Sequence, residues 1–112
     1  MITSQMLKGM LEGCILQVIS MEETYGYEIS RKLNLYGFGE ISEGTIYPLL
    51  LRLQKNGLIS SVMKASENGP NRKYFNLTAK GEIELNSFKD NCKELFYAIN
   101  QLFENDKGGQ IL

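Results

Sequence analysis

The chain has 112 residues, of which 43% are hydrophobic, and its formal net charge is −1. This length suits one domain that buries about two-thirds of its unfolded surface. The sequence has no apolar run of about 18 residues and no signal-peptide pattern, so we expect a cytoplasmic protein with no membrane segment. It contains no histidine, no closely spaced cysteine pair and no phosphate-binding glycine loop, so we predict no enzyme, no metal and no cofactor.

The charges are distributed unevenly along the chain. Residues 31–80 carry eight Lys or Arg and three Glu, whereas acidic residues outnumber basic ones on both sides of this segment. A local excess of positive charge is what attraction to phosphate requires, and a solvated basic surface is the simpler alternative. Cys14 and Cys92 lie far apart in helical patterns, so we interpret them as packed thiols in a reducing compartment. A redox switch is the less favoured alternative.

The first third of the chain predicts two helices. Ser4 can cap a first helix, whose apolar side chains recur at helical spacing through residues 7–18 on more than one face. Thr24 can cap a second helix, which Gly37 should end.

A third helix is expected from Ser42 to Asn56, although it contains two poor helix formers. Its apolar stripe consists of Ile46, Leu49, Leu50 and Leu53. Pro48 leaves the Gly44 carbonyl without a partner, which costs about 3 kcal/mol in an ordinary helix interior. We expect the cost to be smaller near a solvated helix start, where Gly44 lets the backbone approach a phosphate. The alternative is that Pro48 bends a buried helix.

Residues 58–78 predict a two-stranded hairpin. The segments LISSVMKA and RKYFNLT flank a polar turn cluster, and Phe75 and Leu77 should share one face. We expect the tip to project into solvent or onto a charged partner, since its side chains are polar or basic. They are Lys64, Asn68, Asn71, Arg72 and Lys73.

The last apolar stripe has alternating spacings of three and four residues. Its members are Leu85, Phe88, Cys92, Leu95, Ile99 and Leu102. This repeat is typical of helices that pair along their length. A helix of roughly 26 residues would span about 40 Å, which exceeds what a three-helix core needs. Part of it should therefore contact a second chain, and burial against the first helix is the alternative.

The order of three helices and a hairpin is that of a winged helix-turn-helix. We therefore predict a mainly α fold with a small β-hairpin (α+β), followed by a long C-terminal dimerisation helix. The expected parts are a winged helix-turn-helix domain at 1–78, the dimerisation helix at 79–105 and a flexible tail at 106–112. In this fold the third helix packs its apolar stripe inward and directs its first turns into the major groove.

Four segments in this order resemble the PadR family of bacterial transcriptional regulators: LKGMLEGCILQVIS, YGYEISRKL, ISEGTIYPLLLRLQKNGLI and NGPNRKYFNLTAKG. The resemblance covers residues 7 to about 103. It implies a homodimeric repressor that binds a palindromic operator in double-stranded DNA and leaves it when a small apolar or phenolic effector binds. The single C-terminal helix resembles the short subfamily.

The fold and the resemblance together give the candidate DNA contacts. They are Tyr25, Tyr27, Ser42, Glu43, Gly44, Thr45, Tyr47, Arg52, Asn71, Arg72 and Lys73. Thr45 can bond a base or a phosphate, and the Tyr47 hydroxyl can reach a phosphate oxygen. Arg72 and Lys73 are the favoured phosphate-binding side chains of the wing. Core packing is the alternative for the tyrosines, and a solvated surface is the alternative for Arg52.

The candidate dimer interface and effector pocket lie on the first and last helices. The residues are Met6, Met10, Cys14, Leu85, Phe88, Cys92, Leu95, Phe96, Ile99 and Leu102. A ligand that shifts these helices would change the roughly 34 Å separation that successive major grooves require. Drug-binding relatives can stack planar ligands on a tryptophan that this chain lacks, and Phe96 could substitute for it. A closed, packed interface is the alternative to a pocket.

A winged-helix module that binds another protein and no operator is the second functional hypothesis. A protein-binding wing more often presents apolar side chains, whereas this one presents Arg72 and Lys73. The charge pattern therefore favours DNA.

Overall fold

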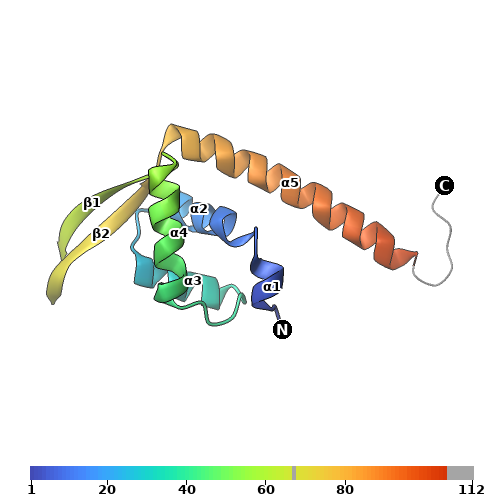
Figure 1. The fold of residues 1–112 in the computed structure, drawn as a ribbon, viewed down its shortest axis with the longest axis horizontal. Coiled ribbons are helices and arrows are strands. Elements are labelled where there is room, and N and C mark those ends of the chain that lie inside the picture. The colour runs from blue at the N-terminus through green and yellow to red at the C-terminus, as the bar shows by residue number, and fades with distance from the viewer. Residues whose placement is uncertain (67, 106–112) are drawn as a thin grey trace.

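The computed structural model describes residues 1–66 and 68–105 (Figure 1). The elements are α1 (Ser4–Leu7), α2 (Leu11–Met21), α3 (Gly26–Leu35), α4 (Glu43–Lys55), β1 (Ile59–Ser66), β2 (Gly69–Leu77) and α5 (Ala79–Glu104). The predicted mainly α fold with one hairpin and a long last helix is confirmed. The tail predicted at 106–112 lies outside the described residues. In the part that is described, no helix is both long enough and apolar enough to cross a bilayer.

The first predicted helix is two helices, so the expectation of one continuous helix from Ser4 was wrong. The cap of α1 is Thr3, whose hydroxyl accepts a hydrogen bond from the Met6 amide at 3.2 Å. Gly9 then adopts a φ of 86°, a left-handed conformation that ends α1 and turns the chain before α2. The apolar periodicity runs across this turn, which is why it did not reveal the break. No residue of α1 is buried.

Thr24 does not cap α3, which corrects the second expectation. Its backbone pairs instead with β2, since the Phe75 amide donates to the Thr24 carbonyl at 2.7 Å and the Thr24 amide donates back at 3.3 Å. Tyr25 therefore occupies the N-cap position of α3, and Gly37, at a φ of 98°, follows the end of that helix as predicted. The connector between α2 and α3 thus pairs with the outer edge of β2 at Thr24.

The start and end of α4 match the prediction. The Ser42 hydroxyl accepts a hydrogen bond from the Thr45 amide at 3.2 Å, and the chain leaves the helix at Asn56. Pro48 is exposed, whereas Ile46, Leu50 and Leu53 are buried. The proline therefore lies on the outer side of the first half of α4, where the Gly44 carbonyl can reach solvent.

Strands β1 and β2 form an antiparallel hairpin whose two faces have different roles. The register pairs Ile59 with Leu77 and Ser61 with Phe75, and this face turns toward the helices. The opposite face carries Lys64 across from Arg72. Both strands extend beyond the helices at their turn end (Figure 1). The hairpin is thus anchored at its base and free at its tip.

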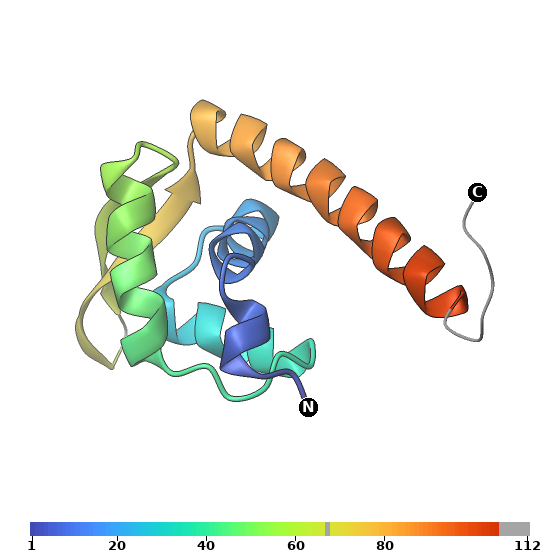
Figure 2. The same ribbon diagram turned by 45° about the vertical axis from the view of Figure 1, so that its right-hand side comes forward.

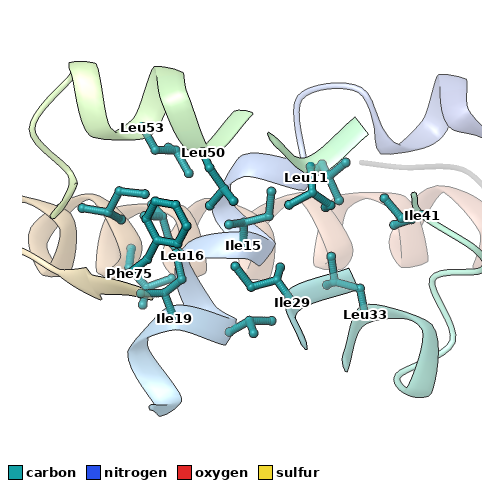
Figure 3. Packing of buried hydrophobic residues seen from close by; sticks show 14 residues of the cluster. Leu11, Ile15, Leu16, Ile19, Ile29, Leu33, Ile41, Leu50, Leu53 and Phe75 are labelled. Atoms are coloured by element: carbon teal, nitrogen blue, oxygen red, sulfur yellow. The ribbon is translucent and has the colours of Figure 1, made fainter. Parts of the chain in front are cut away.

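The core lies between α2, α3, α4 and the base of the hairpin (Figure 3). Its buried side chains are Leu11, Ile15, Leu16, Val18, Ile19, Ile29, Leu33, Ile41, Ile46, Leu50, Leu53, Ile59, Phe75 and Leu85. Only the last of these comes from α5. One small apolar core therefore holds the helix-turn-helix and the hairpin in fixed positions.

The first turns of α5 pack on this domain, and the rest of the helix runs past it (Figures 1 and 2). The Phe88 ring covers Gly13 of α2 so closely that a Cβ at that glycine would lie 2.4 Å from the ring. Farther along, Phe96 and Leu102 are 52% and 61% exposed. Burial against α2, the alternative considered from the sequence, thus applies to Leu85 and Phe88 and not to the distal half.

Candidate nucleic-acid interface

The starts of α3 and α4 and the middle of β2 border a groove of about 430 Å³. Its lining residues are Tyr25, Gly26, Tyr27, Glu43, Tyr47, Arg72, Lys73 and Phe75. Most of these were predicted from the sequence as DNA contacts, although they come from three separate segments. We call this surface the wing groove.

Two tyrosines of the wing groove present half of their surface to solvent. Tyr27 is 55% exposed and Tyr47 is 50% exposed, so neither is a core residue. Tyr25 is half-buried, and its ring lies 5.2 Å from the Tyr74 ring in an edge-on arrangement. The hydroxyl groups of Tyr27 and Tyr47 are therefore available to an incoming ligand.

The Arg72 side chain is ordered by an aromatic contact. Its guanidinium carbon lies 4.6 Å from the centroid of the Tyr25 ring, within the range of a cation–π interaction. Within residues 1–66 and 68–105, neither Arg72 nor Lys73 forms an ion pair with a carboxylate. The wing groove thus contains two cations that form no ion pair among the described residues, together with one acid, Glu43.

Other predicted contacts surround the start of α4. Ser42, Gly44 and Thr45 are exposed, and the Ser42 and Thr45 hydroxyl oxygens are 3.2 Å apart. Gly44 has open space around it, because an added Cβ would meet nothing closer than the Ser42 Oγ at 3.6 Å. Asn71 is exposed on β2 and does not line the wing groove.

Arg52 is separated from the wing groove. Its Nε donates to Glu12 Oε1 at 2.5 Å, which joins α4 to α2. The pair is partly exposed, so its contribution to stability is small. Arg52 and Thr45 both line a second hollow of about 630 Å³ on the other side of α4. The structure therefore separates Arg52 from the residues of the wing groove and places it in the same hollow as Thr45.

Sequence reasoning missed the network that fixes the wing. Glu23 Oε2 accepts a hydrogen bond from Asn76 Nδ2 at 2.7 Å, and its other oxygen pairs with Lys64 Nζ. The hydrogen bonds from Asn76 and from Lys64 lower the pKa of Glu23 below its ordinary value. Strand alternation could have placed Lys64 and Asn76 on one face, but no local signal places Glu23 beside them.

The residues predicted for the dimer interface fall into two groups. Leu85 is buried, and Met10, Cys14, Phe88 and Cys92 are half-buried where α2 meets α5. Burial, and then the neighbouring Cys92, raise the pKa of the Cys14 thiol. The exposed group comprises Met6, Leu95, Phe96, Ile99 and Leu102. Met6 lies on α1, and the other four residues of this group form an uncovered apolar stripe on α5 together with Phe103.

Comparison with known proteins identifies the family. Residues 15–87 match the transcriptional regulator PadR-like family. A PadR-like transcriptional regulator from Bacillus cereus is 56% identical, with a TM-score of 0.81 over 89% of this chain and 97% of that one. A Streptococcus transcriptional regulator is 43% identical, with a TM-score of 0.79 over 89% and 98% of the two chains.

Two more distant relatives extend the comparison. An uncharacterised protein of Lysinibacillus sphaericus is 29% identical over 106 residues, which are 93% of this chain and 97% of that protein. Bacillus subtilis PadR, solved in complex with operator DNA, is 28% identical with a TM-score of 0.64, and the match covers 70% of this chain and 46% of that one. The chain described here belongs to the PadR-like family of transcriptional regulators, as its sequence motifs predicted, and is not an enzyme.

Proposed function

We propose that this regulator is a homodimeric repressor that binds a palindromic operator through α4 and the wing groove. The observation that carries the proposal is the convergence of Tyr27, Tyr47, Arg72 and Lys73 in one groove beside the exposed start of α4. Hydroxyl groups and unpaired cations around a helix N-terminus are the chemistry that holds a phosphate backbone. The operator-bound structure of Bacillus subtilis PadR supports this reading.

Each part of the site has its own role in the proposal. The first turn of α4 enters the major groove, where Thr45 and the backbone at Gly44 approach bases or phosphates. Arg72 and Lys73 bind phosphate on the flanking backbone, and the Tyr25 ring holds the Arg72 guanidinium ready for that contact. Binding then requires little ordering of the wing, since β2 is already attached to the connector at Thr24.

Dimerisation is proposed to occur along the distal half of α5. Its apolar side chains repeat at spacings of three and four residues and are exposed in a single chain. Pairing of two such helices would bury this stripe and fix the separation of the two α4 helices. Successive major grooves on one side of B-DNA require a separation of about 34 Å.

The repressor is proposed to leave DNA when a small apolar or phenolic effector binds. A shift of α5 relative to the winged domain would alter the separation of the α4 helices. Leu85 and Phe88 form the contact that such a shift would change.

A salt titration of DNA binding tests the proposal. Fluorescence anisotropy should measure the affinity of the protein for duplex DNA from upstream of its own gene at several salt concentrations. Operator binding predicts that log K falls with log salt by about 0.9 for each phosphate contacted. Arg72→Ala and Lys73→Ala should each reduce the slope by about one unit, because each removes one contact.

A matched control removes charge elsewhere. Lys89→Ala changes an exposed lysine on α5, away from the wing groove, and should leave the slope unchanged. A salt-independent affinity, or an affinity equal to that for random DNA, would exclude operator binding and leave the protein-interaction hypothesis.

A further inference from the structure

The second hollow, of about 630 Å³, lies between α1, the start of α2, the loop that joins α3 to α4, and one side of α4. Figure 2 shows α1 beside that loop. Its main apolar residues are Leu7, Leu11, Phe38, Ile41 and Leu49, and its polar side chains include Lys8, Glu12, Glu40, Thr45 and Arg52. We call it the α1–α4 hollow.

We propose that the α1–α4 hollow binds an uncharged, largely apolar small molecule and that its occupancy alters the position of α4. The inference rests on the proposed function and gives the effector a site distinct from the α5 interface. Ligand pockets for small organic molecules typically measure about 300 to 1,000 Å³ and have mainly apolar walls. The α1–α4 hollow satisfies both conditions.

The apolar wall is continuous with the core. Leu11 and Ile41 are buried core residues, and Leu7, Phe38 and Leu49 are half-buried and pack against the same core. Figure 3 shows Leu11 and Ile41 at one end of the cluster. An apolar ligand in the hollow would thus extend the core and remove apolar surface from water.

The charges of the wall select an uncharged ligand. Arg52 and Glu12 form an ion pair, and Lys8 and Glu40 carry opposite charges, so the side-chain charges of the wall cancel. The α-ammonium group of Met1, which also lines the hollow, adds one positive charge. A charged ligand would still meet a like-charged side chain for each oppositely charged one. The Thr45 hydroxyl and the Lys8 ammonium can each hydrogen-bond a single polar group of a ligand, such as a phenolic hydroxyl.

The geometry of α4 connects the hollow to the DNA surface. Thr45, Leu49 and Arg52 are spaced four and three residues apart, so they lie on one side of α4 and line the hollow. Glu43 and Tyr47 each lie two residues from Thr45, on the opposite side of the helix, and line the wing groove. A single helix therefore separates the two cavities, so a ligand that contacts Thr45 and Leu49 touches the same helix that carries Glu43 and Tyr47 of the wing groove.

The other wall of the hollow is less firmly held. None of the residues of α1 is buried, and the chain leaves α1 through Gly9 in a left-handed turn. A ligand can therefore enter by moving α1, and in the hollow it would contact Thr45 and Leu49 of α4.

Binding of an uncharged dye tests the site. The probe is N-phenyl-1-naphthylamine, whose fluorescence rises in apolar surroundings, titrated into the full-length protein. Leu7→Trp places a larger ring in the hollow and should weaken dye binding by about tenfold. Leu35→Trp makes the same change at an exposed position on α3 outside the hollow and should leave the dye affinity unchanged, as should Phe96→Ala on α5.

The outcomes separate the possible sites. Loss of dye binding in Phe96→Ala with normal binding in Leu7→Trp would overturn the proposal and assign the dye to the α5 stripe. The absence of any fluorescence increase with the unmodified protein would overturn it as well, whether a partner chain or side chains fill the hollow. If Leu7→Trp fails to fold, dye-induced shifts of the Leu7, Ile41 and Leu49 methyl NMR signals replace it, and unshifted signals contradict the site.

A second measurement tests the effect on α4. Saturating dye should weaken operator binding by about fivefold in the unmodified protein and in Leu35→Trp, but not in Leu7→Trp. Dye binding at the hollow with unchanged DNA affinity would refute the link to α4. Failure to bind DNA without dye would refute the proposed function instead, whereas the dye titration would still report on the hollow.

Discussion

Gly81→Ala should destabilise the protein, because Gly81 of α5 packs directly against the backbone at Leu58, in the connection between α4 and β1. A Cβ at this position would lie 2.0 Å from the Leu58 carbonyl oxygen. That oxygen already accepts a hydrogen bond from the Thr78 amide at 3.1 Å, so it cannot move without breaking a second contact. The backbone of α5 must therefore shift away from the winged domain.

The size of the effect follows from two opposing contributions. Overpacking a filled site costs about 1 to 3 kcal/mol, and the upper value applies here because the neighbour is backbone. Alanine recovers about 1 kcal/mol through its higher helix propensity. The net loss in the free energy of unfolding is about 2 kcal/mol, which corresponds to a fall in Tm of about 10 °C for a chain of this size.

Thermal unfolding followed by circular dichroism measures this loss, and Gly44→Ala is the matched control. Gly44 also lies in the first turn of a helix, but the space around it is open. Gly44→Ala should therefore raise stability by up to about 1 kcal/mol through helix propensity alone. Equal stability of the Gly81→Ala and unmodified proteins would show that the close approach at Leu58 does not constrain α5.

Three further predictions concern the wing, the dimer and α4. Because hydrogen bonds from Asn76 and Lys64 lower the pKa of Glu23, its carboxylate stabilises the fold above its unfolded pKa of about 4.3. That contribution disappears as the pH falls through the lower folded pKa. Glu23→Gln should therefore make the free energy of unfolding less dependent on pH in the acidic range, measured by denaturant unfolding at several pH values. An unchanged pH dependence would argue against the network. Phe96→Glu should shift the proposed dimer toward monomer, measured by light scattering, and a persistent dimer would exclude the α5 stripe. Arg52→Ala should change the salt slope of operator binding less than Arg72→Ala does, and equal changes would contradict the separation of Arg52 from the wing groove.

The elements with strong local signals were predictable from sequence. Ser42 and Asn56 bound α4 as expected, since a capping hydroxyl and a terminating Asn-Gly pair act over one turn. The length of α5 followed from its continuous apolar repeat. The break between α1 and α2 was missed because Gly9 interrupts the backbone without interrupting the apolar spacing.

The candidate site was predictable in its residue types and less so in its geometry. The sequence proposed Tyr27, Tyr47 and Arg72 as DNA contacts, with core packing as the alternative for the tyrosines, and the structure brings all three to one groove. The pairing of Arg52 with Glu12 joins residues 40 positions apart, and no local pattern encodes such a contact. The backbone pairing of Thr24 with Phe75 was missed for the same reason, because it depends on how two distant segments pack.

That pairing has a mechanical consequence. Because β2, which carries Arg72, is hydrogen-bonded through Phe75 to Thr24, two residues before α3, a force on the hairpin is transmitted to the start of that helix. We therefore expect the hairpin, α3 and α4 to move together as one rigid body. Slow deuterium uptake at the Phe75 amide, compared with the fast uptake expected at the hairpin turn, would show that the hairpin is held at this pairing.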